Sequence, residues 1–217
     1  MQFLDRYDAG EQLAMALSQY KKTPNGVILG LPRGGVITAY ACAKILQLPL
    51  DVTCPRKLGA PSNPELAIGA VTETGLAVLN EPLIAQLRVP QSYIKAEIER
   101  QKERAQQYLR LFRTGKLPRV LKDKIVILID DGLATGATMK AAIKAVRHEQ
   151  PQKLVVAIPV SPRDTLHEMQ ELADEVYCLE APDGFYAVGQ FYQHFIQIDN
   201  DQVVEVLESA REHFKIN

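Results

Sequence analysis

The chain has 217 residues, of which 47% are hydrophobic and 24% are charged, and its net charge is −1. This length and apolar content suffice for a full core, and the near-neutral charge argues against a protein that coats nucleic acid or a membrane. Cys42, Cys54 and Cys178 form no CxxC pair, the start is too acidic for a signal peptide, and no apolar run approaches the roughly 20 residues of a membrane span. These features predict a reduced, cytoplasmic protein whose anionic ligands must be held by a local site.

The first strand and helix patterns occupy residues 27–46. VILGL (27–31) is a continuous apolar run, and a mostly apolar helix is expected from about Val36 to Leu46. Between them, GLPRGGV (30–36) places two glycines, which allow unusual dihedrals and close backbone approach, beside the permanent charge of Arg33. Taken alone, this segment is more typical of an ordinary strand-to-helix turn.

Two segments then interrupt the alternation of strands and helices. Residues 66–80 predict a hairpin that turns at 73–75 and projects from the sheet. Residues 92–112 predict a long helix with one apolar seam and many charged residues elsewhere. That pattern favours a helix lying on the core with its polar face in solvent.

Strands and helices alternate again in the second half of the chain. Strands are expected at 125–130, 154–160 and 175–180, and helices at about 136–147 and 162–173. Continuous Val, Ile and Leu runs are typical of parallel strands covered on both faces. The sequence therefore predicts an α/β fold with an open, mostly parallel, twisted sheet flanked by helices.

Two adjacent acids follow the strand expected at 125–130. Ligands of open α/β sheets bind at the carboxyl ends of the strands, where Asp130 and Asp131 would lie. Carboxylates accept hydrogen bonds from sugar hydroxyls and can lie near a hard cation. The segment GLATGAT (132–138) then opens a helix, whose free N–H groups and dipole would form an anion site. These parts indicate a sugar phosphate, although an acidic strand end before a helix capped by Thr135 fits equally well.

The string VILIDDGLATGAT (126–138) resembles the 5-phosphoribosyl-1-pyrophosphate (PRPP) motif of the type I phosphoribosyltransferases. Nearly the whole chain is similar to a group of predicted bacterial phosphoribosyltransferases of undetermined substrate. They share the F-x-D-R-x-x-A-G start, the LPRGG loop, the PRKLGAP…E-x-AIGA block and the P-x-G-F-x-AVGxxY segment. The resemblance implies one phosphoribosyltransferase domain over 1–217, with a core at about 24–180, a lid or insert at 56–115, a hood at 181–198 and a terminal helix at 201–214.

The resemblance also implies a reaction, in which a nitrogen of a nucleobase-like acceptor displaces pyrophosphate from PRPP with Mg²⁺ as the cofactor. Asp130 and Asp131 would bind the ribose and the metal and stabilise oxocarbenium character, while Lys57 and Glu65 are further catalytic candidates. Surface charge near a mobile hairpin is an equal alternative for Arg56, Lys57 and Glu65. The residues expected to bind PRPP are Arg33, Gly34, Gly35, Arg56, Gly132, Leu133, Ala134, Thr135, Gly136, Ala137 and Thr138.

The acceptor is less well defined. EAPDGFYAVGQFYQHF (180–195) resembles the hood of hypoxanthine-guanine phosphoribosyltransferases, in which an aromatic ring stacks on the purine. Phe185 and Tyr186 are the stacking candidates, and packing of this tail on the core is the alternative. Ala134 and Ala173 stand where those enzymes place the Asp and Lys that read the purine, so purine specificity does not carry over. The alternative function is a non-catalytic, PRPP- or nucleotide-sensing regulator of the same fold, and a homodimer is a candidate assembly.

Overall fold

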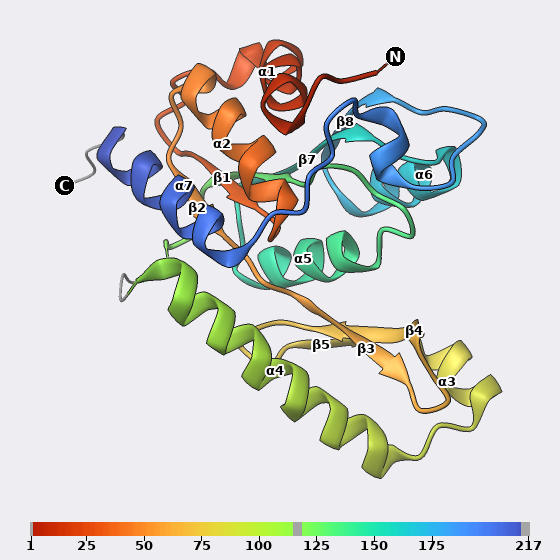
Figure 1. Cartoon of the computed structure of the whole chain (residues 1–217). Coiled ribbons are helices and arrows are strands. Elements are labelled where there is room, and N and C mark those ends of the chain that lie inside the picture. Colours follow the sequence, from red (N-terminus) through yellow and green to blue (C-terminus); the bar gives the residue numbers. More distant parts are fainter. Residues whose placement is uncertain (1, 115–118, 214–217) are drawn as a thin grey trace.

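The computed structural model describes residues 2–114 and 119–213, apart from the side chain of Glu65. Its centre is a five-stranded parallel sheet in the order β2-β1-β6-β7-β8 (Figure 1). Strands β1 and β6 pair in register over their whole length, so both end at the same edge of the sheet. The five strands are β1 (Gly26–Gly30), β2 (Leu50–Val52), β6 (Ile125–Ile129), β7 (Lys153–Val160) and β8 (Glu175–Glu180).

The central strands are continuous apolar runs, and successive side chains of a strand point to opposite faces of the sheet. Both faces of this sheet are therefore apolar. Ile28, Ile127 and Val155 pack beneath three helices, α1 (Arg6–Ala16), α2 (Gly34–Leu46) and α7 (Asn200–His213). The neighbouring residues of the same strands pack against α5 (Ala137–His148) and α6 (Arg163–Leu172) on the other face. The expected open α/β sheet flanked by helices is therefore confirmed.

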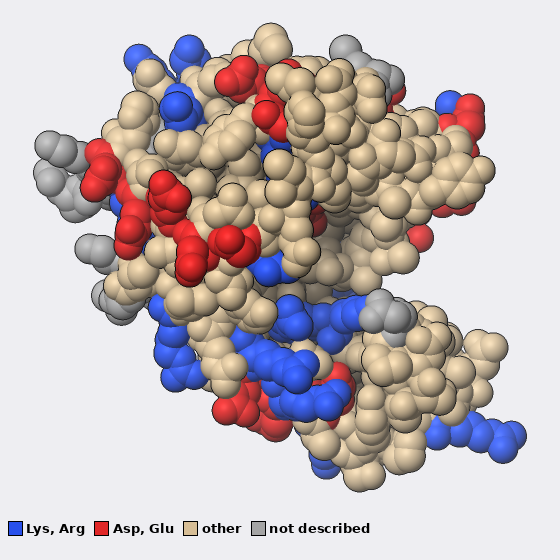
Figure 2. Space-filling view, viewed as in Figure 1, with Lys and Arg blue, Asp and Glu red and all other residues tan. Residues whose placement is uncertain are grey.

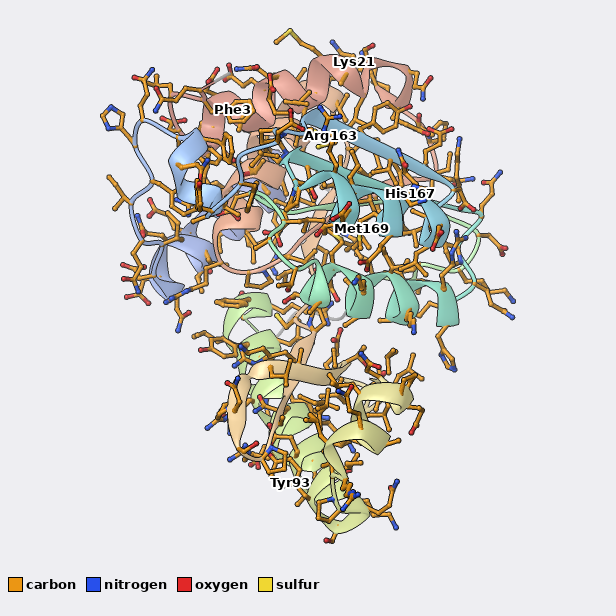
Figure 3. All side chains as sticks on the ribbon, turned by 90° about the vertical axis from the view of Figure 1, so that its right-hand side faces the viewer. Phe3, Lys21, Tyr93, Arg163, His167 and Met169 are labelled. Atoms are coloured by element: carbon orange, nitrogen blue, oxygen red, sulfur yellow. The ribbon has the colours of Figure 1, made fainter. Side chains whose placement is uncertain are left out.

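Residues 56–113 form an insert between β2 and β6. It contains an antiparallel sheet of β3 (Arg56–Ala60), β4 (Asn63–Val71) and β5 (Ala77–Leu79), followed by α3 (Glu81–Leu87) and α4 (Gln91–Arg113). The insert has its own apolar cluster and lies below α5, with Tyr93 at the end remote from the main sheet (Figures 1 and 3). The expected hairpin is thus present, extended by a third strand.

Residues 181–198, the hood, follow β8 and include a short 3-10 helix at Val188–Phe191. The hood is tied to the N-terminal segment by backbone hydrogen bonds. The Phe3 N–H donates to the Phe191 carbonyl, and the Gln193 N–H donates to the Phe3 carbonyl, both at 2.8 Å. A second 3-10 helix, Ser18–Tyr20, follows α1. The N-terminal segment and the hood therefore lie side by side.

Several elements differ from the expectations. The helix expected from Val36 begins at Gly34, and the one expected from Gly136 begins at Ala137. Helix α1 and the strands β2 and β3 were not predicted, because β2 has only three residues and β3 begins with two charged ones. The expected ends of the insert at residue 115 and of the terminal helix at residue 214 lie outside the described residues. No helix in the described part of the chain combines the length and the apolar character needed to cross a membrane.

Candidate active site

The loops after β1, β6 and β8 meet at the carboxyl edge of the sheet. Asp130 and Asp131 directly follow β6, and the turn that begins with them leads to α5. The Leu133 N–H donates to the Val160 carbonyl at 2.9 Å, which attaches this turn to the end of β7. The Thr165 hydroxyl of α6 donates to the Ala134 carbonyl at 2.8 Å and fixes the other side. The predicted PRPP motif is therefore a rigidly anchored turn at the sheet edge where ligands of α/β folds bind.

Two glycines allow this turn to form. Gly132 has a φ of 154° and Gly136 a φ of 66°, values that residues with a Cβ rarely adopt. Gly136 caps α5 in the left-handed conformation, and Thr135 is a minor contributor, since its hydroxyl accepts from the Ala137 N–H at 3.5 Å. Thr135 and Ala134 are exposed. The N–H groups at the start of α5 thus lie beside an open turn, as an anion site requires.

The loop after β1 lies against the two acids. Gly34 and Gly35 belong to the first turn of α2, and neither has a positive φ. A Cβ on Gly34 would lie 1.9 Å from the Asp131 Oδ2, and one on Gly35 would lie 2.6 Å from the Asp130 Oδ1. The expected unusual dihedrals are therefore wrong for these two glycines, whereas the expected close approach is correct. Arg33, which precedes them after a cis peptide bond, is exposed.

The two carboxylates have different electrostatic surroundings. Burial raises the pKa of Asp130 well above its ordinary value, and the adjacent negative charge of Asp131 adds to this effect. The Asp130 Oδ1 accepts a hydrogen bond from the Asp131 N–H at 2.8 Å. Asp131 instead forms an ion pair with Arg6 of α1, with 2.7 Å between Nε and Oδ2. The Asp130 carboxylate is thus held by a backbone donor, and the Asp131 carboxylate is held by a cation.

The site candidates of the insert lie in its first two strands, β3 and β4. Arg56 is half-buried, with its guanidinium carbon 5.5 Å from the centre of the Tyr108 ring of α4. Lys57 is a half-buried residue of β3, and Glu65 lies in β4 with its side chain outside the described part of the chain. The chain enters the insert beside the end of β1, because the Thr53 N–H donates to the Gly30 carbonyl at 3.3 Å.

The two aromatic candidates of the hood have different environments. Phe185 stacks on Phe191, with 5.3 Å between the ring centres, and contributes to a small apolar cluster. Tyr186 is 92% exposed. The ring that contacts the acid turn is Tyr192, whose hydroxyl donates to the Asp131 carbonyl at 2.5 Å. Arg6 and Tyr192 were not predicted as site residues, although both belong to segments quoted for the resemblance, the F-x-D-R start and the AVGxxY end.

The acid turn offers a suitable environment for a divalent cation. Asp130 and Asp131 supply carboxylate oxygens, the donors that Mg²⁺ prefers. The absence of a Cβ on Gly34 and Gly35 leaves these oxygens next to the N-terminus of α2, where a phosphate group would be stabilised. The two carboxylates would therefore supply oxygen donors to such a cation.

A groove of about 360 Å³ adjoins this turn. It runs between α5 and the sheet of the insert, begins at Ala137, and includes Lys140 and Lys144. The surface is hollowed between the core and the insert, and Lys and Arg side chains gather on the insert side of this hollow (Figure 2). The near-neutral chain thus concentrates positive charge close to the candidate site.

The comparisons with known proteins agree with this geometry. A model of the phosphoribosyl transferase domain family matches residues 2–194. Rv0571c of Mycobacterium tuberculosis H37Rv, provisionally named a phosphoribosyl transferase, is 43% identical over 212 residues, or 98% of this chain and 48% of that protein. MT0597 of strain CDC 1551, with the same provisional name, matches to the same extent. The chain spans about half the length of these curated relatives.

A solved structure extends the comparison to three dimensions. The crystal structure of TT1426 from Thermus thermophilus has 40% sequence identity and a TM-score of 0.84, and the match covers 96% of this chain and 99% of that one. The insert and the hood are thus part of an arrangement that a second chain adopts along almost its whole length. Together with the family model, this shows that the chain belongs to the phosphoribosyl transferase domain family, a family of transferases.

Proposed function

We propose that this chain is a PRPP-dependent phosphoribosyltransferase, which uses Mg²⁺ and transfers the phosphoribosyl group to a nitrogen of a nucleobase-like acceptor. The observation that carries the proposal is the contact between the two predicted turns. Gly34 and Gly35 approach Asp131 and Asp130 so closely that a Cβ would not fit. A loop suited to a diphosphate and a turn suited to a ribose phosphate are therefore adjacent, in the order that PRPP requires.

In this proposal, backbone groups bind most of the negative charge of the substrate. The 5′-phosphate is received by the N–H groups of the turn from Ala134 to Thr138, at the start of α5. The diphosphate is received at the start of α2, with Arg33 and Arg56 as cationic partners. Asp130 and Asp131 accept hydrogen bonds from the ribose hydroxyls. The same two carboxylates would hold Mg²⁺, which would supply charge neutralisation to the leaving group.

The chemical step breaks the bond between the anomeric carbon and the diphosphate oxygen and forms a bond from that carbon to the acceptor nitrogen. Pyrophosphate leaves with the electron pair of the broken bond, and the acceptor nitrogen loses its proton to a base, for which Glu65 is the candidate. Positive charge develops on the ribose ring in between, and the two carboxylates stabilise it. Closure of the insert with Lys57 over the site would exclude water, a competing nucleophile.

The acceptor is proposed to bind under the hood, with Phe185 or Tyr186 stacking on it. A homodimer and a cytoplasmic location complete the proposal. The latter is supported by the three free thiols of Cys42, Cys54 and Cys178, which fit a reducing compartment. Size-exclusion chromatography with light scattering tests the dimer directly.

The proposal is tested by incubating the protein with PRPP, Mg²⁺ and a panel of purine, pyrimidine and carboxylated bases. Release of pyrophosphate and a new nucleotide mass in the mixture are the expected results. The Asp130→Asn/Asp131→Asn variant should release none, whereas Glu171→Gln, at an exposed position of α6, should behave as the wild type. Tight PRPP binding without pyrophosphate release across the panel would favour a PRPP-sensing regulator. The absence of PRPP binding would overturn both functions.

A further inference from the structure

Arg6 reaches the candidate site from the first turn of α1, and its side chain is only 9% exposed. Its Nε donates to the Asp131 Oδ2 at 2.7 Å. Its Nη1 donates to the carbonyl oxygen of Ile196 in the hood at 2.8 Å. Its guanidinium carbon lies 3.9 Å from the centre of the Phe195 ring. One buried cation therefore contacts both the acid turn and the hood.

The surroundings leave this ion pair little freedom to move. A Cβ on Gly34 would lie 2.5 Å from the Arg6 Nε and 1.9 Å from the Asp131 Oδ2, so the pair packs directly against the backbone of Gly34. On the opposite side, Phe195 packs on Tyr192, with 5.0 Å between the ring centres, and Tyr192 bonds the Asp131 carbonyl. Asp131 is thus held at its side chain by Arg6 and at its backbone by Tyr192.

The N-terminal segment fixes the base of this arrangement. Phe3 is fully buried and pairs with the hood through the backbone of Phe191 and Gln193, and it lies at the start of α1 (Figure 3). The Asp5 carboxylate accepts the N–H groups of Tyr7 and Asp8 at 2.8 and 3.0 Å and starts α1 at Arg6. These contacts fix the backbone at Arg6 independently of the contact between its side chain and Asp131.

We propose that Arg6 is a positioning residue for PRPP, which holds the Asp131 carboxylate beside the pyrophosphate loop and couples its position to that of the hood at Phe195 and Ile196. This inference rests on the proposed function, because it assigns Asp131 to the ribose. Its physical content is preorganisation. A carboxylate already fixed by a buried guanidinium loses little freedom when the sugar binds, and it stays beside Asp130 despite their mutual repulsion.

A second consequence concerns the order of binding. The donor is proposed to bind at Asp131 and the acceptor under the hood, and Arg6 contacts both places. Because the same guanidinium holds both, PRPP bound at Asp131 further restricts the segment at 195–196, and an acceptor that binds second meets a more restricted hood. Coupling of this kind needs one shared contact that is made to both sites, which Arg6 supplies.

Two substitutions and one matched control test the proposal. Arg6→Gln removes the cation, and Arg6→Lys keeps a cation that can pair with Asp131 but cannot also reach Ile196 with a planar fork. Arg163→Gln is the control, because Arg163 also donates to a hood carbonyl, that of Ala181 at 3.3 Å, and pairs with Asp183, but at an exposed position. The measured quantities are the Kd for PRPP with Mg²⁺, by calorimetry, and amide hydrogen exchange at residues 194–198.

Arg6→Gln is expected to weaken PRPP binding at least tenfold and to speed exchange at 194–198. Arg6→Lys should recover most of the PRPP affinity but not the slow exchange, and Arg163→Gln should change the Kd by less than twofold. A purely structural role would lower the melting temperature and leave the Kd of the folded protein unchanged. If Arg6→Gln does not fold, the test rests on Arg6→Lys. Amide hydrogen exchange at 194–198 that is as slow in Arg6→Lys as in the wild type would contradict the coupling.

The outcomes separate this inference from the proposed function. A wild-type protein that binds no PRPP overturns both. A wild-type protein that binds PRPP, together with an Arg6→Gln variant of equal affinity, overturns the positioning role of Arg6 alone and leaves the proposed function standing.

Discussion

Replacement of Gly34 by alanine tests the close contact on which the proposed site depends. The new Cβ would lie 1.9 Å from the Asp131 Oδ2. To reach the 3.4 Å of an ordinary contact, that oxygen must move by about 1.5 Å, away from the position that Arg6 now holds. Asp131 is a short side chain paired to a buried cation, so a movement of this size separates it from Arg6 or rotates it away from the ribose.

The magnitude follows from the hydrogen bond that is lost. A hydrogen bond to a charged group contributes roughly 1.5–3 kcal/mol, so loss of one bond from Asp131 to a ribose hydroxyl should weaken PRPP binding roughly tenfold to hundredfold. The effect on folding should be smaller. Overpacking lowers the free energy of unfolding by about 1–3 kcal/mol, and alanine in place of glycine in a helix raises it by up to about 1 kcal/mol. A fall of a few degrees in the melting temperature is expected.

The assay is calorimetric titration of PRPP with Mg²⁺ into the wild type, Gly34→Ala and a control. Gly184→Ala is a matched control, because a Cβ at that hood glycine meets nothing within 4 Å. A double-mutant cycle adds a sharper criterion, since Gly34→Ala and Asp131→Asn act on the same carboxylate and should not be additive. PRPP affinity within twofold of the wild type, or strictly additive effects, would refute the reasoning.

Three further changes address other parts of the molecule. Asp130→Asn/Asp131→Asn should abolish detectable PRPP binding and lower the melting temperature, because the amide at position 131 leaves the buried Arg6 without its charged partner; calorimetric titration and a melting curve check this. Tyr192→Phe should lower stability by about 1 kcal/mol, since the Asp131 carbonyl loses its donor, as a urea titration measures. Burial raises the pKa of Glu73, so the charged carboxylate destabilises the fold at pH values above its ordinary pKa. Glu73→Gln should therefore have the melting temperature of the wild type at pH 4 and a higher one at pH 8. An equal difference in melting temperature at both pH values would contradict this.

The sign of the Glu73 prediction follows from linkage. A carboxyl whose folded-state pKa is raised binds its proton more tightly in the folded chain than in the unfolded one. Its favourable contribution is complete below the unfolded pKa and is lost as the pH rises through the folded value. Glu73 also has a buried Oε2 that lacks a hydrogen-bond partner among the described residues, so its charge is costly there and the neutral amide is expected to be better tolerated.

The fold was predictable where local pattern and tertiary position agree. The strand at 175–180 has its expected bounds, and those at 27–31, 125–130 and 154–160 shift by one residue at one or both ends. Uninterrupted Val, Ile and Leu runs leave a parallel strand little alternative, since only the centre of the sheet buries both faces. Strand β3 contains Arg56, Lys57 and Gly59, and no apolar period distinguishes it from a loop. It forms because β4 provides a partner, which is a tertiary effect.

The candidate site divides in the same way. Asp130, Gly132 and Gly136 are defined by a short string whose geometry depends on local backbone conformation, and the positive φ values of the two glycines agree with that expectation. Arg6 and Tyr192 join the site only through contacts across 125 and 61 positions of the chain. Neither residue type has a local pattern that points to a carboxylate so distant in the sequence. Position in the fold, rather than the motif itself, makes them part of the site.

This division explains why the donor is better defined than the acceptor. The proposed PRPP contacts are made by backbone N–H groups, by glycines that permit close approach and by two acids at a strand end, all of which a short string specifies. The proposed acceptor contacts depend on the hood, whose position depends on contacts with Phe3, Arg6 and Asp131 elsewhere in the chain. Phe185 is engaged with Phe191, and Ala134 contributes its carbonyl to Thr165 and only a methyl group to the open turn. In the proposed arrangement, hood side chains whose position Arg6 holds select the acceptor, so a change of Arg6 should alter acceptor selection as well as PRPP affinity.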